Sequence, residues 1–372
     1  MSAHETHARN QRVGCGSGAI GLRAAVWALL VLAALTLASA AAADRWWPRQ
    51  WERPRQHRAC SASALSSLTA CRFDIKDDYY EALARCANVP ERSERRECTE
   101  EAADERKEGR EECGDVFEAR VDLCEKLGED PYDPDFAPEN FESDPENVDA
   151  GDLNPYLPVA VGNQWILEGG DEVITINVLP KTKLIEGVRC LVVNDLVTEG
   201  GVPIEDTNDW FALGRDSSVH YCGEEVRDFE TFEGDDPVEP ELVSIEGAFK
   251  VGREGAKPGI LMPATLTVGE VYRQEYAIGE AEDAAEILST DYTHGEDPEL
   301  DELVPQALAE LLCDDADCLV TREFSPLDPE VFERKYFAPG IGIFLEVDPE
   351  EGEVVQLVDC NFHDKCDDLP EP

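Results

Sequence analysis

The chain has 372 residues, of which 82 are Asp or Glu and only 32 are Lys or Arg, so the formal net charge is −50. Hydrophobic residues make up 42% of the chain, which is enough for a folded core in spite of this charge. So acidic a chain repels DNA, RNA and anionic lipid headgroups, and we therefore expect no nucleic-acid partner.

The N-terminus has the pattern of an export signal. Arginines precede an apolar run from Val26 to Leu37, and small residues follow it up to Ala43. This order is typical of a cleaved signal peptide, here residues 1–43. The alternative is an uncleaved anchor, with the basic, tryptophan-rich segment 44–58 at a membrane interface. We expect an exported protein (periplasmic, cell-surface or secreted) that contacts a membrane only if this segment stays uncleaved.

The cysteines predict a disulfide-linked helical hairpin over residues 59–128. Of the 13 cysteines, Cys15 lies in the predicted signal, which leaves an even number for an oxidising compartment. The first six are spaced by 11, 15, 12, 15 and 11 residues, a palindrome. Two antiparallel helices rise equally per residue, so this spacing favours nested pairs. The predicted disulfides are Cys60–Cys124, Cys71–Cys113 and Cys86–Cys98. The layout is similar to that of other disulfide-stapled helical hairpins in architecture alone.

An acidic segment follows the hairpin. Residues 129–152 hold ten acidic residues, four prolines and no basic residue. Such a segment repels itself and stays extended, so we expect a solvated linker between two domains.

Residues 153–372 have the pattern of a β-rich domain. Short runs rich in β-branched and aromatic residues are bounded by Gly, Pro and Asp, which is typical of antiparallel strands. The expected strands are 164–168, 172–179, 189–198, 209–213, 271–277, 318–325, 332–338, 341–347 and 353–359. One amphipathic helix is expected within residues 300–312, shortened or kinked by Pro305. The fold class is therefore α+β, with the strands forming a sandwich or a partial barrel.

The six remaining cysteines lie in this β-rich domain. Cys190 and Cys222 are expected on neighbouring strands, and Cys313–Cys318 and Cys360–Cys366 would each close a short loop. Crossed pairing among the last four stays open.

Several short motifs in residues 154–347 resemble an uncharacterised group of exported bacterial proteins. They are NPYLP (154–158), GNQWILEGG (162–170), GILMPA (259–264), YRQEY (272–276), GEAED (279–283) and APGIG (338–342). The resemblance implies export and a β-rich domain, and it assigns no activity.

Candidate chemistry is limited to clusters of carboxylates, because after the predicted signal no histidine pair has metal-ligand spacing and no G-x-S-x-G motif occurs. Oxygen-rich clusters in loops hold calcium, and a carboxylate pair can also hydrolyse glycosides. With so many acidic residues, such clusters also arise from composition alone. The candidate metal ligands are Glu280, Glu282, Asp283, Asp206 and Asp209.

These features favour a non-enzymatic exported protein that binds a protein partner or an apolar ligand, with no catalytic residues. A carboxylate-dependent glycoside hydrolase and a calcium-dependent surface adhesin are the alternatives. No cofactor is expected, except calcium if the adhesin alternative holds.

Overall fold

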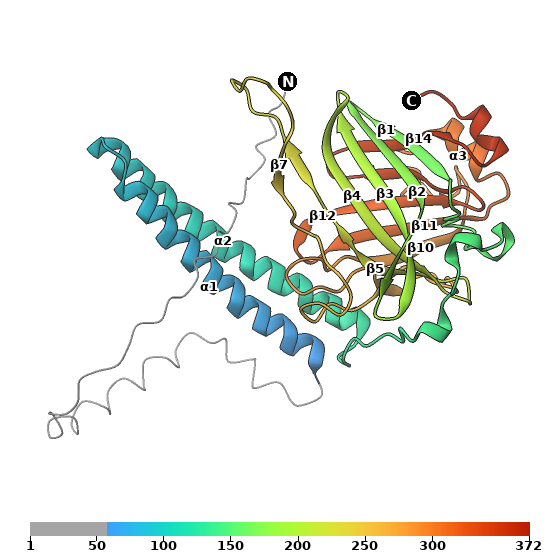
Figure 1. The fold of residues 1–372 in the computed structure, drawn as a ribbon, viewed down its shortest axis with the longest axis horizontal. Coiled ribbons are helices and arrows are strands. Elements are labelled where there is room, and N and C mark those ends of the chain that lie inside the picture. Colours follow the sequence, from blue (N-terminus) through green and yellow to red (C-terminus); the bar gives the residue numbers. More distant parts are fainter. Residues whose placement is uncertain (1–57) are drawn as a thin grey trace. The chain divides into compact units, whose positions relative to one another are not determined.

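The computed structural model describes residues 58–372, which have an α+β fold, a helical hairpin followed by one large antiparallel sheet (Figure 1). The expected signal peptide 1–43 and the segment 44–58, except its last residue, lie outside the described residues. No helix in the described part of the chain is both long enough and apolar enough to span a membrane.

Two long helices form the hairpin. α1 covers Ala59–Ala87 and α2 covers Arg92–Leu127, and the connection contains Pro90, which cannot continue a helix. Three disulfides join the helices in the nested order, Cys60–Cys124, Cys71–Cys113 and Cys86–Cys98, with Cα–Cα distances of 5.6, 5.9 and 5.6 Å. Few apolar side chains are buried between the helices, so these crosslinks replace much of the core that such a hairpin lacks.

The C-terminal part of α2 lies against the sheet. The Arg120 guanidinium donates to both carboxylate oxygens of Glu282, over 2.9 and 2.5 Å. Nearer the end of the helix, Lys126 Nζ lies 2.8 Å from an oxygen of Glu286. The hairpin and the sheet belong to one compact unit that spans residues 57–372.

The acidic segment 129–152 is packed against the sheet, which differs from the expected solvated linker. Phe141 is 2% exposed and packs edge-on against Phe136 and the ring of His220. Tyr132 donates its hydroxyl hydrogen to the carbonyl of Pro258 over 2.8 Å. Three short 3-10 turns shape the rest of the segment: Pro138–Asn140, Pro145–Asn147 and Ala150–Asp152. The apolar residues between the acidic ones hold the segment, because their burial outweighs the repulsion among carboxylates at its exposed side.

The described residues contain 14 strands in one antiparallel sheet. The main path runs β7-β6-β4-β3-β2-β1-β14-β13-β12-β11-β10-β9, and β5 pairs with both β4 and β8. The strand bounds are Gln164–Gly169 (β1), Glu172–Ile185 (β2), Val188–Glu199 (β3), Val202–Leu213 (β4), Val219–Glu225 (β5), Asp228–Glu230 (β6), Glu241–Ser244 (β7), Gly259–Met262 (β8), Val271–Arg273 (β9), Ala284–Tyr292 (β10), Cys318–Ser325 (β11), Asp328–Ala338 (β12), Gly342–Asp348 (β13) and Glu353–Cys360 (β14).

The sheet rolls up until β8, which branches from β4 through β5, comes beside β9 at one end of the main path. Beyond β8 and β9, Lys257 forms an antiparallel bridge with Tyr276, and the Lys257 amide donates to the Tyr276 carbonyl over 2.9 Å. Gly259 allows this approach, since a Cβ at that position would lie 1.6 Å from the carbonyl oxygen of Gln274. The roll therefore encloses an interior face, on which the main core is built around residues such as Trp165, Leu167 and Leu357.

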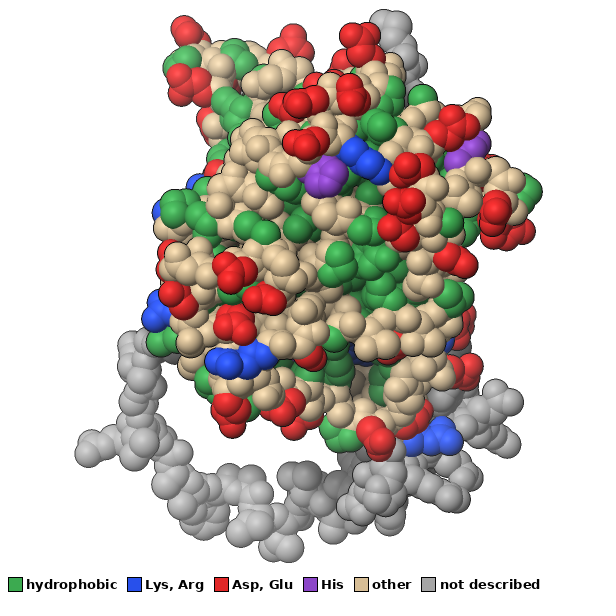
Figure 2. Space-filling model, turned by 90° about the vertical axis from the view of Figure 1, so that its right-hand side faces the viewer, with side chains coloured by type: hydrophobic (Ala, Val, Ile, Leu, Met, Phe, Trp, Pro, Cys, Tyr) green, Lys and Arg blue, Asp and Glu red, His purple; other side chains and the backbone are tan. Residues whose placement is uncertain are grey.

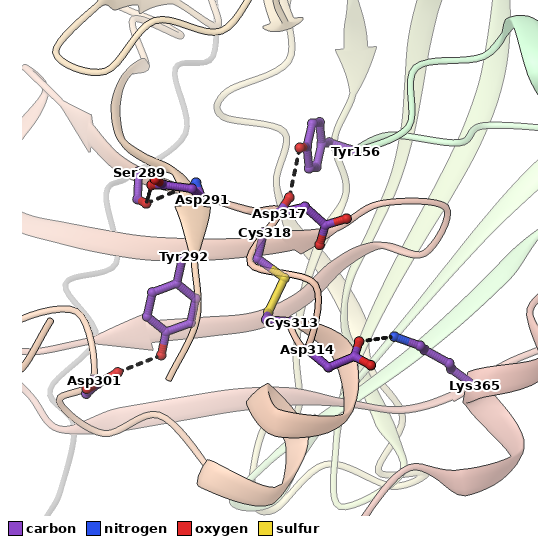
Figure 3. The surroundings of a disulfide bond; sticks show 10 residues. All are labelled: Tyr156, Ser289, Asp291, Tyr292, Asp301, Cys313, Asp314, Asp317, Cys318 and Lys365. Carbon is purple, nitrogen blue, oxygen red and sulfur yellow. Dashed lines mark hydrogen bonds and ion pairs between the residues drawn. A yellow bond between two sulfur atoms is a disulfide. The ribbon is translucent and has the colours of Figure 1, made fainter. Parts of the chain in front are cut away.

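A short helix and a loop pack against the C-terminal strands, and Leu308 and Leu312 of the helix belong to the main core. α3 spans Gln306–Leu312 and begins after Pro305, as its sequence predicts. The disulfide Cys313–Cys318 joins its end to β11, and Lys365, in the 3-10 turn Asp364–Asp368, pairs with Asp314 over 2.9 Å (Figure 3). The other two disulfides are Cys190–Cys222 and Cys360–Cys366. Six disulfides indicate that the protein folds in an oxidising environment.

Candidate functional site

A cavity of about 110 Å³ lies inside the roll. Its wall is mostly apolar, and two acidic residues, Asp195 and Asp209, complete it. The apolar lining residues are Leu157, Val159, Trp165, Ile176, Val193, Phe211 and Ile343. The Trp165 indole donates to the carbonyl of Ile341 over 2.6 Å, which holds the ring in place on β1. The cavity thus combines a shaped apolar wall with a polar end, the usual composition of a small-molecule site.

The alternation of neighbouring strands places both acids inside. In β3 and β4, Val193 pairs with Asp209 and Asp195 pairs with Thr207, so the two carboxyl groups share the inner face. Tyr221 on β5 donates its hydroxyl hydrogen to Oδ1 of Asp209. By contrast, Oδ1 of Asp195 is shielded from solvent and has no hydrogen-bond partner. A buried acceptor without a partner is costly, so Asp195 is the group of this cavity that a ligand would satisfy.

Burial changes the acidity of both groups. It raises the pKa of Asp209 to about 8, and the nearby carboxyl group of Glu224 adds to the shift, while the hydrogen bond from Tyr221 opposes it. Burial also raises the pKa of Asp195 well above its ordinary value, and Asp209 and Glu346 contribute further. A carboxyl group taken out of water favours its neutral form because the charged form loses its hydration.

More acids continue from the cavity along the interior. Burial raises the pKa of Glu224 to about 7. The pKa values of Glu275 and Asp283 are raised too, first by burial and then by neighbouring carboxyl groups. The carboxyl group of Glu224 is one of those that raise the pKa of Glu275. The acids in this part of the interior therefore favour their neutral forms more than exposed carboxyl groups do.

One lysine faces this acidic interior. Lys335 Nζ on β12 lies 3.4 Å from Glu323, 3.6 Å from Glu333 and 3.7 Å from Glu346. Burial lowers the pKa of Lys335, but these three carboxylates together hold it well above the ordinary value. Burial raises the pKa of Glu346 to about 6, although Lys335 opposes the shift. Lys335 is thus engaged by three glutamates, and it offsets only part of the upward shift in the pKa of Asp195.

The five residues predicted as metal ligands lie in different surroundings. Asp209 and Asp283 belong to the interior, whereas Asp206 is paired with Arg227 over 3.0 Å and Glu282 is buried against Arg120. Glu280 is exposed in the turn before β10. Within residues 58–372, no group of three or more His, Cys, Asp or Glu side chains is arranged to hold a metal ion.

The sequence interpretation missed the interior acids outside its loop clusters. Asp195, Glu224, Glu275 and Glu346 lie on strands or beside them. A usable signal was present, because Asp195 follows Leu191 and Val193 at a spacing of two and so continues the inward-facing row. An acidic residue within an inward-facing row of apolar residues is expected to be buried, and its burial costs the free energy of removing its carboxyl group from water.

The outer surface is also acidic, and the face in Figure 2 carries many Asp and Glu side chains and few Lys or Arg side chains.

Comparison of this chain with protein-family models, with curated proteins and with solved structures found no match. Any function must therefore be argued from the cavity and its residues.

Proposed function

We propose that this is an exported, non-enzymatic binding protein that holds a small, largely apolar ligand inside its rolled sheet. The observation that supports this proposal is the cavity of about 110 Å³, whose wall is apolar apart from Asp195 and Asp209. Its volume equals that of roughly four molecules of liquid water at ~30 Å³ each. A ligand of about five non-hydrogen atoms suits such a space.

The hydrolase alternative has weaker support. A glycosidase needs one carboxylic acid that donates a proton and a second, ionised carboxylate as nucleophile or base. Here burial shifts the pKa of both cavity acids upward. The space beside them is also smaller than a sugar ring with its neighbours in a polysaccharide.

Export is part of the proposal. The pattern of residues 1–43 and the twelve cysteines paired in six disulfides support a periplasmic, cell-surface or secreted protein. The motifs between residues 154 and 347 support membership in the uncharacterised exported group that they resemble.

The test is a titration of the oxidised full chain with isobutanol, followed by NMR of ¹³C-labelled isoleucine methyl groups. Ile176 and Ile343 both line the cavity, so their methyl signals report its occupation directly. We expect these two signals to shift in a saturable way, because the alcohol has an apolar body and a polar end like the cavity itself.

A variant pair tells cavity binding from surface binding. Ile176→Phe fills the space, whereas Val173→Phe adds the same bulk to the other face of β2, three residues earlier. We expect Ile176→Phe to abolish the response and Val173→Phe to retain it. Absence of saturable shifts in the unaltered protein, or equal responses in both variants, would contradict the proposed function.

A further inference from the structure

The polar end of the cavity offers carboxyl oxygens and no free N–H donor. Asp195 and Asp209 supply carboxyl oxygens, and the remaining lining residues are apolar, so no side chain of the cavity wall other than the Trp165 indole carries an N–H donor. That indole already donates to the Ile341 carbonyl. Oδ1 of Asp195 lacks a partner, so the cavity presents acceptors and calls for a donor.

Most of the ionisable groups around Asp195 and Asp209 are acidic as well. The groups that act electrostatically on the two aspartates are Glu205, Glu224, Glu346, Tyr221 and Lys335, of which Lys335 alone is cationic. The three glutamates around Lys335 already engage that cation. An anionic ligand would meet only repulsion here, whereas a cation would relieve the repulsion among the acids.

We propose that the ligand is a small organic cation, an amine with a short apolar body, whose ammonium group donates hydrogen bonds to Asp195 and Asp209. This inference rests on the proposed function and specifies its ligand class. An ammonium group brings three donors and no acceptor, which matches the unpartnered oxygen of Asp195 and the free lone pairs of both carboxyl groups. Its apolar body lies against Trp165, Ile176 and Phe211.

The same geometry couples binding to protons. An amine needs ionised aspartates, and at neutral pH these groups hold protons, since burial raises the pKa of Asp209 to about 8. Binding therefore releases protons, and amine affinity increases as the pH rises from 6 toward 8. The affinity for an uncharged alcohol has no such dependence, because a hydroxyl group can accept a hydrogen bond from a protonated acid and donate one to an ionised acid.

The experiment compares three probes with one carbon skeleton: isobutylamine, isobutanol and isobutyrate. Each is titrated into the oxidised full chain at pH 6 and pH 8.5, with the Ile176 and Ile343 methyl signals as the readout. At pH 8.5 we expect the amine to bind at least about tenfold more tightly than the alcohol, since hydrogen bonds between ionised groups exceed neutral ones in strength. Isobutyrate should not bind.

Two substitutions locate the effect. Asp195→Asn keeps the shape of the side chain and removes its charge, so we expect amine affinity to fall at least about tenfold while alcohol affinity is retained. Asp206→Asn is the matched control, because Asp206 lies on the neighbouring strand β4 but pairs with Arg227 away from the cavity. It should leave both affinities unchanged.

The outcomes separate this inference from the proposed function. If isobutanol binds in the cavity but the amine binds no more tightly, or if Asp195→Asn leaves the amine preference intact, the ligand class is wrong and the binding function stands. If neither isobutanol nor isobutylamine shifts the Ile176 and Ile343 signals, both proposals are contradicted. If isobutyrate is the tightest of the three probes, the assignment of a cation is overturned.

Discussion

Arg120 and Glu282 lie 162 positions apart in the chain and form a two-pronged ion pair between the hairpin and the sheet, with N–O distances of 2.9 and 2.5 Å. Both side chains are removed from solvent, at 8% and 1% exposure. Glu282 also accepts a hydrogen bond from the Gly279 amide over 2.7 Å. One carboxylate therefore joins α2 to the turn that leads into β10.

Replacing Arg120 with Met should destabilise the protein strongly. The change leaves the Glu282 carboxylate buried without its guanidinium partner, and breaking a buried pair from one side costs about 3–5 kcal/mol. Chemical denaturation measures the loss, and hydrogen exchange should show faster opening at the end of α2 and in residues 279–283. Glu286→Gln is the control, because the Lys126–Glu286 pair is 41% and 24% exposed and should contribute less than about 1 kcal/mol. Equal losses in the two variants would contradict a special role for the buried pair.

The middle disulfide of the hairpin should matter more than the disulfide at its tip. Cys71–Cys113 closes 42 residues and Cys86–Cys98 closes 12, and the loop-entropy relation assigns them at most roughly 4 and 3 kcal/mol. We expect C71S/C113S to speed hydrogen exchange along both helices, whereas C86S/C98S affects only the residues next to the turn. Full protection of both helices in C71S/C113S would show that packing alone holds the hairpin.

Phe141 should anchor the acidic segment on the sheet. It is 2% exposed, so Phe141→Ala removes a buried ring and should lower the free energy of unfolding by about 3–5 kcal/mol. Limited proteolysis with a glutamate-specific protease should then cut within residues 129–152 faster than in the unaltered protein. Phe73→Ala provides the matched control, because this phenylalanine is 63% exposed and should change neither measurement. An unchanged cleavage rate in Phe141→Ala would contradict the anchor.

Stability should decrease as the pH rises from 5 to 8. Burial raises the pKa of Asp209 to about 8 and that of Glu224 to about 7, so the folded state binds protons more tightly than the unfolded chain. Stability from such groups is full below the unfolded pKa and is lost as the pH rises through the folded pKa. One group with this shift contributes a slope of up to about 1.4 kcal/mol per pH unit.

Denaturation curves at pH 5, 6, 7 and 8 measure that slope. Asp209→Asn mimics the protonated acid at every pH, so it should flatten the curve and be more stable than the unaltered protein at pH 8. A stability that is constant or increases over this range would show that the interior acids keep ordinary pKa values.

Local patterns were sufficient for much of the fold. The cysteine palindrome predicted the nested hairpin pairs, because helical rise is the same in both helices. Alternating runs predicted strands such as β1, β3 and β11 close to their observed bounds. The expected strand 271–277 ends early at Arg273, where the chain leaves the ladder to meet Lys257 across the closure. That departure depends on the distant strand β8 and has no local signal.

Glu282 and Asp283 show which features the sequence determines and which only the tertiary structure decides. Their adjacency on an extended segment by itself determines that the two carboxylates point to opposite sides, as alternation requires. Only the rolled sheet decides that one side faces Arg120 and the other faces the acidic interior. The acids beside the cavity come from the consecutive strands β3 and β4, and solvent is excluded from them only when the sheet closes. The sequence therefore determined the helical hairpin with its nested disulfides and most of the long strands, whereas closure of the sheet determined which carboxyl groups are removed from water.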